Sequence, residues 1–177
     1  FYPNYPNILK NFNGIACVVP KQFIESSGQD LRHDYAIVLL EKDNVSKKYG
    51  SMDISINSID TTKPKTAIGY PNDTPFLRGS VYKHRGNVEE KSVTLSSPGQ
   101  QERFFLMPDN DLSPVASGGP WIQNSKIVGI NSQNWQPLGG TLGMRSPLFN
   151  EDFLAFYNDA LLKLNDFSNR PTDDLIA

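Results

Sequence analysis

Short β-rich apolar segments, separated by turn-forming residues, constrain the fold of this chain more than any other feature of its sequence. They are residues 14–20, 34–40, 66–70, 79–83, 92–95, 103–107, 121–122, 126–131 and 141–145. Proline, glycine, asparagine and serine gather between them, as at residues 71–73, 97–99 and 108–110. Many short strands at this spacing indicate an all-β fold built as a sandwich or a barrel.

The end of the chain has a different pattern. Asn150 can cap a helix, and Glu151 and Asp152 favour its first turn. The apolar residues that follow repeat with helical spacing and form one stripe, which comprises Phe153, Phe156, Tyr157, Ala160, Leu161 and Leu164. We therefore predict a helix over residues 151–165, followed by a polar tail to residue 177.

The composition argues against several classes of protein. Of the 177 residues, 38% are hydrophobic and 20% are charged, which suits a folded globular chain and not a disordered one. The net charge is −2 without a basic excess, so we expect neither nucleic acid nor a membrane as a partner. No segment approaches the length of a membrane-spanning helix. Two histidines and one cysteine lack the spacing of metal ligands, so we expect no metal and no cofactor.

Two further expectations concern the start of the chain and its cysteine. The first residues have neither the basic start nor the apolar core of a signal peptide, and the chain begins at Phe1. We therefore expect that residues upstream have been removed. Cys17 is the only cysteine, so no disulfide can form within the chain. We expect it to be a small buried apolar residue, with a link to another chain as the alternative.

The strongest chemical signal is Ser117, which lies in the sequence VASGGP at residues 115–120. The small residues around it would let a substrate carbonyl approach the Ser117 hydroxyl. They would also let backbone N–H groups point toward a developing oxyanion. Taken alone, the motif could be any glycine–proline turn.

A hairpin and a closing strand follow Ser117. The sequence VGINS at residues 128–132 comes first, and the turn at residues 138–140 then precedes the strand at residues 141–145. The predicted helix closes the chain. This order resembles the second barrel of trypsin-like serine peptidases, which runs through a serine turn, a hairpin, a pocket-wall strand, a last strand and a terminal helix.

The resemblance extends upstream of Ser117. The sequence HDYAIVLL at residues 33–40 resembles the strand that carries the catalytic aspartate in this family. The sequence IGYPNDTP at residues 68–75, followed by GNV at residues 86–88, is similar to the bacterial glutamyl-endopeptidase branch. There a Gly-Tyr-Pro turn opens the second barrel. The likeness runs from about residue 14 to residue 164.

The resemblance implies a fold of two antiparallel β-barrels and a C-terminal helix, in which the first barrel lacks its opening strands. Residues 1–60 would form the rest of the first barrel and a linker, residues 61–148 the second barrel, and residues 149–177 the helix and tail. The resemblance also implies that Ser117 attacks the scissile carbonyl and that Asp34 orients the catalytic imidazole.

A catalytic histidine is not evident in the chain. The resemblance places it some tens of residues before Asp34, where the only histidine is His33. Adjacent residues of a strand point to opposite faces, so His33 should not both meet Asp34 and face Ser117. His84 should lie on a second-barrel strand, away from Asp34. Either a segment upstream supplies the histidine, or the protein is a peptidase homologue that has lost catalysis.

The resemblance assigns the oxyanion hole to the backbone N–H groups of Val115 and Ser117. Family members usually have glycine where this chain has Val115, which is β-branched and follows Pro114. Ala116 stands where trypsin-like enzymes have an aspartate that pairs with a new N-terminus. That activation switch is therefore not expected here.

The resemblance also implies a substrate pocket. Its wall strand, which would pair with the substrate backbone, comprises Asn131, Ser132, Gln133 and Asn134. The glutamyl branch has histidine at the position of Asn131, so a preference for acidic substrates is not expected. Asp111, with Leu112 beside it, lies six residues before Ser117, where trypsin has a pocket-base aspartate that favours Arg or Lys in the substrate. The alternative is that Asp111 is a turn residue.

Two functions therefore stay open. The first is a serine endopeptidase that hydrolyses protein or peptide substrates, with its histidine on a separate N-terminal segment and with no activity in this chain alone. The second is a catalytically inactive homologue that acts as a binding or structural module. The intact serine turn and the Asp34 segment favour the first. The family further implies a secreted or extracytoplasmic protein.

Overall fold

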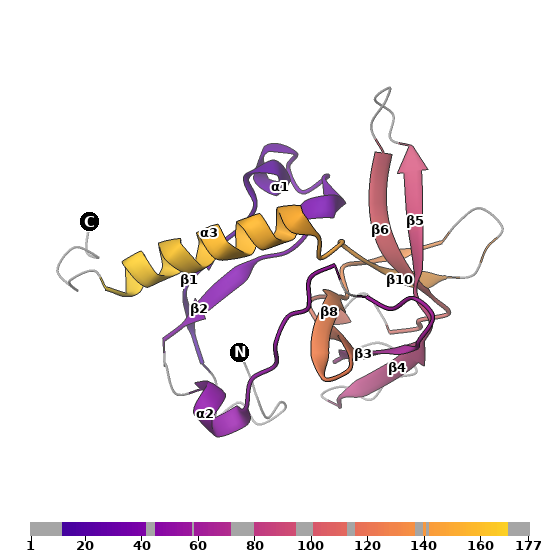
Figure 1. Cartoon of the computed structure of the whole chain (residues 1–177), viewed down its shortest axis with the longest axis horizontal. Coiled ribbons are helices and arrows are strands. Elements are labelled where there is room, and N and C mark those ends of the chain that lie inside the picture. Colours follow the sequence, from indigo (N-terminus) through magenta and orange to yellow (C-terminus); the bar gives the residue numbers. More distant parts are fainter. Residues whose placement is uncertain are drawn as a thin grey trace.

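The computed structural model describes residues 12–41, 45–57, 59–71, 80–94, 101–112, 116–136, 140 and 142–169 of the chain. Antiparallel strands make up most of the described secondary structure, and one long helix lies near its C-terminal end (Figure 1). The predicted β-rich class with a C-terminal helix is confirmed. No helix in these residues is long and apolar enough to cross a membrane.

The N-terminal part contains a two-stranded antiparallel sheet of β1 (Gly14–Val18) and β2 (Ile37–Leu40). Between these strands lie the short helix α1 (Lys21–Glu25) and the 3-10 helix η1 (Leu31–His33), neither of which the sequence pattern predicted. The prediction that a strand begins at residue 34 was wrong. Asp34 instead ends η1, and its N–H donates to the Leu31 carbonyl at 3.4 Å.

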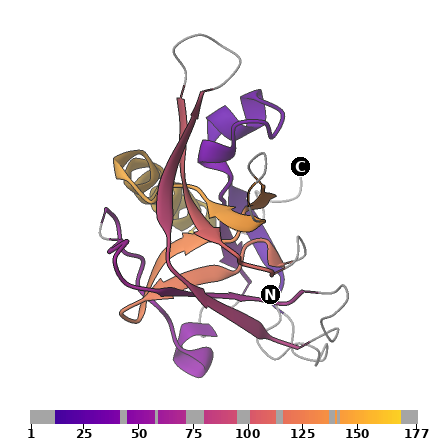
Figure 2. The same cartoon turned by 90° about the vertical axis from the view of Figure 1, so that its right-hand side faces the viewer.

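The larger part contains two four-stranded sheets. The first has the order β4-β3-β7-β8 and comprises β3 (Lys65–Gly69), β4 (Tyr82–Gly86), β7 (Pro120–Gln123) and β8 (Lys126–Ile130). The second has the order β5-β6-β10-β9 and comprises β5 (Glu89–Thr94), β6 (Gln101–Pro108), β9 (Gln133–Trp135) and β10 (Gly143–Ser146). The long β5–β6 pair extends beyond the rest of its sheet (Figure 2). Most predicted strands are present, with bounds that differ by a few residues.

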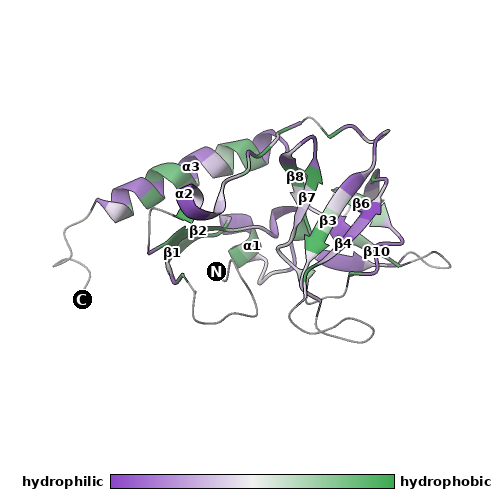
Figure 3. Cartoon of the chain, turned by 90° about the horizontal axis from the view of Figure 1, so that it is seen from below, coloured by the Kyte–Doolittle hydropathy of each residue, from purple (hydrophilic) through white to green (hydrophobic). Residues whose placement is uncertain are grey.

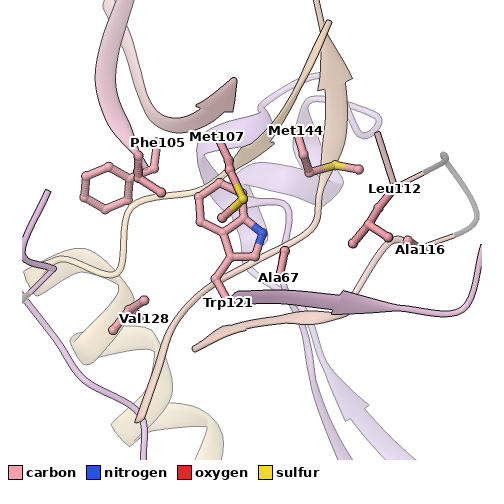
Figure 4. Close-up of a cluster of buried hydrophobic side chains, with 9 residues drawn as sticks. Ala67, Phe105, Met107, Leu112, Ala116, Trp121, Val128 and Met144 are labelled. Carbon is pink, nitrogen blue, oxygen red and sulfur yellow. The ribbon is translucent and has the colours of Figure 1, made fainter. Parts of the chain in front are cut away.

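One hydrophobic cluster fills the space between these two sheets (Figure 4). Trp121 of β7 is fully buried in it, and Met107 of β6 and Met144 of β10 contribute from the other sheet. Strands that are polar on one face and apolar on the other place their buried residues in such a layer. Ala116, the residue before the candidate nucleophile, also belongs to this cluster and is 2% exposed.

The segment between the two parts is held along β8. It includes the short helix α2 (Val45–Tyr49) and an isolated parallel bridge between Ile54 and Ile127. The Ser55 N–H donates to the Ile127 carbonyl, and the Ile127 N–H donates to the Asp53 carbonyl, both at 2.8 Å. The weakly periodic linker is therefore anchored by backbone hydrogen bonds.

The C-terminal helix α3 (Glu151–Ser168) begins where the sequence pattern predicts and extends three residues further than expected. The Asn150 side chain accepts a hydrogen bond from the Phe153 N–H at 3.1 Å, which is the predicted cap. Figure 3 shows that α3 carries both hydrophobic and hydrophilic residues along its length. Its Phe153 and Phe156 rings lie 4.9 and 5.1 Å from the Tyr35 ring. Helix α3 thus holds the residue that follows Asp34.

The expectation that Cys17 is buried was wrong, because its side chain is exposed. Successive strand residues face opposite sides, so Val18, which lines a cavity with residues of α3, points away from the face that carries Cys17. Val38 lies opposite Cys17 in the β1–β2 pair and is 51% exposed. The β1–β2 sheet is therefore covered on one face and open on the other among the described residues.

Candidate active site

The turn that carries Ser117 depends on both of its glycines. Gly118 has a φ of +81°, in the left-handed region that residues with a side chain rarely adopt. A Cβ atom on Gly119 would come within 1.9 Å of the Ile68 carbonyl oxygen, so only glycine fits there. Pro120 then begins β7. The structure therefore accounts for both glycines after Ser117, Gly118 by its backbone conformation and Gly119 by its close approach to β3.

Backbone hydrogen bonds fix this turn to Asn131, the residue directly after β8. The Gly118 N–H donates to the Asn131 carbonyl, and the Asn131 N–H donates to the Gly119 carbonyl, both at 2.7 Å. On the other side, the turn packs against β3. A Cβ atom on Gly69 would lie 2.5 Å from the Ala116 Cβ, so the glycine of the Gly-Tyr-Pro sequence leaves room for Ala116.

Asp34 and Ser117 come together at Ser132. The Ser132 hydroxyl donates a hydrogen bond to Asp34 Oδ2 at 2.5 Å. The Ser117 hydroxyl donates to the backbone carbonyl oxygen of Ser132 at 3.2 Å. Ser132 was expected only as part of the substrate-pocket wall, so its contact with Asp34 was missed. Its partner lies 98 residues away in the chain, and no local pattern indicates the pair.

A cavity of about 380 Å³ opens beside these three residues and is lined by Asp34, Ser117 and Ser132. The rest of its wall is mainly apolar and includes Val19 after β1 and Phe23 of α1, together with Gly118 and Asn131. Sequence reasoning missed Val19, which it placed only in a predicted strand, and Phe23 of α1; their apolar character was the only signal. The cavity offers an apolar space next to one carboxylate and two hydroxyl groups.

Neither histidine of the chain is among the residues that line this cavity. His33 Nδ1 lies 3.1 Å from Asp30 Oδ2, and His33 lines a different cavity beside α3. His84 Nδ1 on β4 lies 3.4 Å from Asp111 Oδ1. Both imidazoles thus pair with other aspartates, and His33 lies in the 3-10 helix η1 and not on a strand.

Two of the predicted pocket residues, Asp111 and Leu112, are not among the residues that line the cavity beside Ser117. The Asp111 side chain is 76% exposed and pairs with His84, a geometry that favours the turn interpretation over a pocket base. Leu112 is 1% exposed and packs in the hydrophobic cluster around Trp121, where burial of its apolar side chain is favourable. Val115 lies outside the described residues.

The four residues of the predicted pocket wall, 131–134, differ in exposure and in hydrogen bonding. Gln133 and Asn134 lie on β9, which pairs with β10 and forms the edge of its sheet in the described part of the chain. Gln133 is exposed and Asn134 is half-buried. The Asn131 side chain is buried and bonded within the protein, where its Oδ1 accepts from Trp121 Nε1 at 2.7 Å. Its amide is therefore directed inward.

A buried ion pair lies behind Ser132. Arg145 Nη2 donates to Glu102 Oε1 at 2.5 Å, and both side chains are at least nine-tenths buried. Burial lowers the pKa of Arg145, while the charges of Glu102 and Asp34 oppose that shift. The Arg145 carbonyl accepts from the Ser132 N–H at 3.0 Å. The residue that contacts Asp34 is thus supported by a charged pair on β6 and β10.

Three solved structures are similar to this chain over most of its length. Anisep, a protease from Arthrobacter nicotinovorans, matches with a TM-score of 0.67 and 20% identity, over 90% of this chain and 71% of that one. AL20, a thermostable serine protease from an extremophilic microorganism, matches with a TM-score of 0.68 and 22% identity, over 90% and 71%. A Glu endopeptidase in complex with MPD matches with a TM-score of 0.68 and 21% identity, over 89% and 67%. No protein-family model and no curated protein matches the sequence.

The chain therefore has the fold of bacterial serine proteases, the chymotrypsin-like fold. The resemblance seen in the sequence motifs is confirmed at the level of the fold. At 20–22% identity, these structures identify the architecture, and the function follows from the site.

Proposed function

We propose that this chain is the larger part of a serine endopeptidase that cleaves peptide bonds by acyl transfer. Ser117 is the nucleophile, Asp34 orients an imidazole, and a histidine from a segment upstream is the general base. The observation that carries the proposal is the meeting of Asp34 and Ser117 at one cavity, with Ser132 bonded to both. The N–H groups of Ser117 and Val115 are the proposed oxyanion donors.

The position of β9 at the edge of its sheet favours a peptide as the substrate. An edge strand presents backbone N–H and C=O groups that an extended peptide can pair with. Because β9 begins directly after Ser132, a peptide bound along Gln133 and Asn134 would pass the Ser117 hydroxyl. This arrangement supports a protein or peptide substrate.

The exposed face of the β1–β2 sheet is consistent with a further N-terminal segment that packs on it. Ile15 and Val38 are 48% and 51% exposed on this face. In the described part of the chain the sheet has two strands, and sheets of two strands are marginally stable in water. Anisep extends beyond the region matched by this chain, which covers 71% of it. In our proposal, further strands complete a first β-barrel on this face and bring the histidine to the cavity, while the two four-stranded sheets form the second barrel. A peptidase of this kind would act outside the cytoplasm.

A second candidate function is an inactive peptidase homologue that binds other proteins. The observation that favours it is that neither histidine lines the cavity of Ser117. Without a general base, the serine hydroxyl stays protonated and is a weak nucleophile at neutral pH.

Labelling with a serine-directed fluorophosphonate separates the two functions. We expect the protein extended upstream by its natural sequence to be labelled at Ser117, and the extended Ser117→Ala variant to be unlabelled. Residues 1–177 alone should not react, because triad members act as a unit and loss of one removes most of the acceleration.

Two results would contradict this proposal. Absence of labelling in the folded, extended protein would favour the inactive homologue. Labelling of residues 1–177 alone would mean that a base lies within the chain, and His84→Ala would then be the first variant to test.

A further inference from the structure

The Asn131 side chain forms three hydrogen bonds within the protein, although the sequence predicted it as part of the wall of a substrate pocket. It is 1% exposed, and its Oδ1 accepts from Trp121 Nε1 at 2.7 Å. Its Nδ2 donates to the Ile68 carbonyl at 3.0 Å and to the Ala116 carbonyl at 3.1 Å. Both amide N–H groups and the amide oxygen thus have partners within the protein. The side chain joins β3, β7 and the serine turn.

The orientation of this amide is determined by its partners. Trp121 Nε1 can only donate, and the two backbone carbonyls can only accept. Only one placement of the Asn131 oxygen and nitrogen satisfies all three contacts. Neither an aliphatic side chain nor an unprotonated carboxylate of the same shape can replace it.

The contact with Ala116 matters because of peptide geometry. The Ala116 carbonyl and the Ser117 N–H belong to one planar trans peptide group, in which the C=O and N–H bonds point in opposite directions. The Ala116 carbonyl is held on the protein side by Asn131 Nδ2 and by the Gly119 N–H, which donates at 3.1 Å. The Ser117 N–H is consequently directed away from the Asn131 side chain. Rotation of this peptide group would withdraw that N–H.

We propose that Asn131 is a positioning residue that orients the Ala116–Ser117 peptide group, and through it the Ser117 N–H that stabilises the oxyanion. The proposal rests on the proposed peptidase function of Ser117. It assigns Asn131 to preorganisation of a donor, not to contact with the substrate side chain. Donors that are fixed before the reaction need no reorganisation in the transition state, which is why their orientation affects the catalytic rate.

The test compares two variants of the extended protein. Asn131→Leu removes all three hydrogen bonds of the Asn131 side chain with little change of its shape. Trp121→Phe removes one of the three and leaves the bonds of Asn131 to the Ile68 and Ala116 carbonyls. Both variants lose a buried hydrogen bond, so both lower stability, and activity is measured where urea unfolding shows each to be folded. We expect Asn131→Leu to lower kcat about 100-fold with KM within about twofold, as for loss of an oxyanion donor. Trp121→Phe should keep kcat within about threefold.

A peptide aldehyde provides the second readout, because its tetrahedral adduct carries the oxyanion while a bound substrate does not. Its affinity should fall in Asn131→Leu in parallel with kcat/KM. An Asn131→Leu variant with near-normal kcat would overturn the proposal. An equal loss of kcat in Trp121→Phe would also overturn it, since the effect would then follow from general destabilisation.

The structural readout does not depend on activity. Crystal structures of residues 1–177 with and without Asn131→Leu would report the orientation of the Ala116–Ser117 peptide. We expect a rotated or doubled peptide conformation in the variant, and an unchanged single conformation would refute the inference. If the extended wild-type protein is inactive, the proposed function fails, while this comparison still decides the role of Asn131.

Discussion

Ser132 links the two candidate catalytic residues through different atoms. Its hydroxyl donates to Asp34, and its backbone carbonyl accepts from the Ser117 hydroxyl. Its own N–H is bonded to the Arg145 carbonyl on β10. The Asp34 carboxylate and the Ser117 hydroxyl are therefore held together by one residue whose backbone is itself hydrogen-bonded to β10.

Asp111 provides a prediction at the scale of a single residue. We expect Asp111→Asn to change the free energy of unfolding by less than about 1 kcal/mol, because an exposed ion pair contributes little. The cleavage preference of the extended protein should be unchanged, since the Asp111 carboxylate faces solvent and His84. Urea unfolding and cleavage of a peptide library measure these two quantities. A selective loss of cleavage after Arg or Lys would restore the pocket-base role.

Among the secondary-structure elements, η1 brings Asp34 to the cavity. The Asp30 side chain accepts from the Arg32 N–H at 3.2 Å and from Arg32 Nε at 2.8 Å, and it lies near His33 Nδ1. These contacts, the Arg32 side chain first, lower the pKa of Asp30. A short 3-10 helix has little intrinsic stability, so its capping carboxylate determines how well the residues before Asp34 are ordered.

The Asp30 contacts predict a pH dependence. Because the pKa of Asp30 is lower in the folded chain than its ordinary value of 3.8, the folded state favours the ionised form. This stabilisation is fully present above that ordinary value and is lost as the pH falls through the folded pKa. We expect Asp30→Asn, which can still cap the helix, to lower stability at about pH 7 and to differ less from wild type at about pH 3. Urea unfolding at both values tests this, and an equal difference at both would show that the charge has no part.

Charged residues of the N-terminal part interact with charged residues of the sheet that contains β6 and β10. The Arg145–Glu102 pair is buried, its Arg145 guanidinium lies 4.8 Å over the Phe104 ring, and the Asp34 charge acts on Arg145. Arg32 of η1 in turn interacts with Glu102. Opposite charges thus alternate from the Asp34 segment into the second sheet. Such buried pairs are weak sources of stability but can set the register between parts.

A comparison of single and double variants tests the role of this pair. We expect Glu102→Leu to lower the free energy of unfolding by about 3–5 kcal/mol, because Arg145 is left as a buried charge without its partner. The double variant Glu102→Leu/Arg145→Met should be close to wild type in stability. Urea unfolding of residues 1–177 measures both. Equal destabilisation by the single and double variants would mean that side-chain shape, not charge, is decisive.

Local features of this protein could be predicted from its sequence because their causes are neighbours in the chain. Strand segments follow from β-rich runs between turns, and the start of α3 follows from Asn150 and the apolar stripe after it. The serine turn follows from Gly118 and Gly119, because glycine and the proline after them are turn-forming residues. The order of these segments was sufficient to recognise the fold and to select Asp34 and Ser117.

The tertiary structure alone decided which of the candidates meet. The sequence predicted Ser132 and Asn131 as members of one pocket wall. In the structure, Ser132 binds Asp34, which lies 98 positions away in the chain. Asn131 instead forms hydrogen bonds with Ile68, Ala116 and Trp121. Asp111 is exposed, whereas its neighbour Leu112 is buried in the cluster around Trp121. Hydrogen bonding and burial depend on segments that folding brings together. The sequence by itself therefore determined most of the strands, the C-terminal helix and the serine turn, and packing between distant elements determined which candidate residues meet.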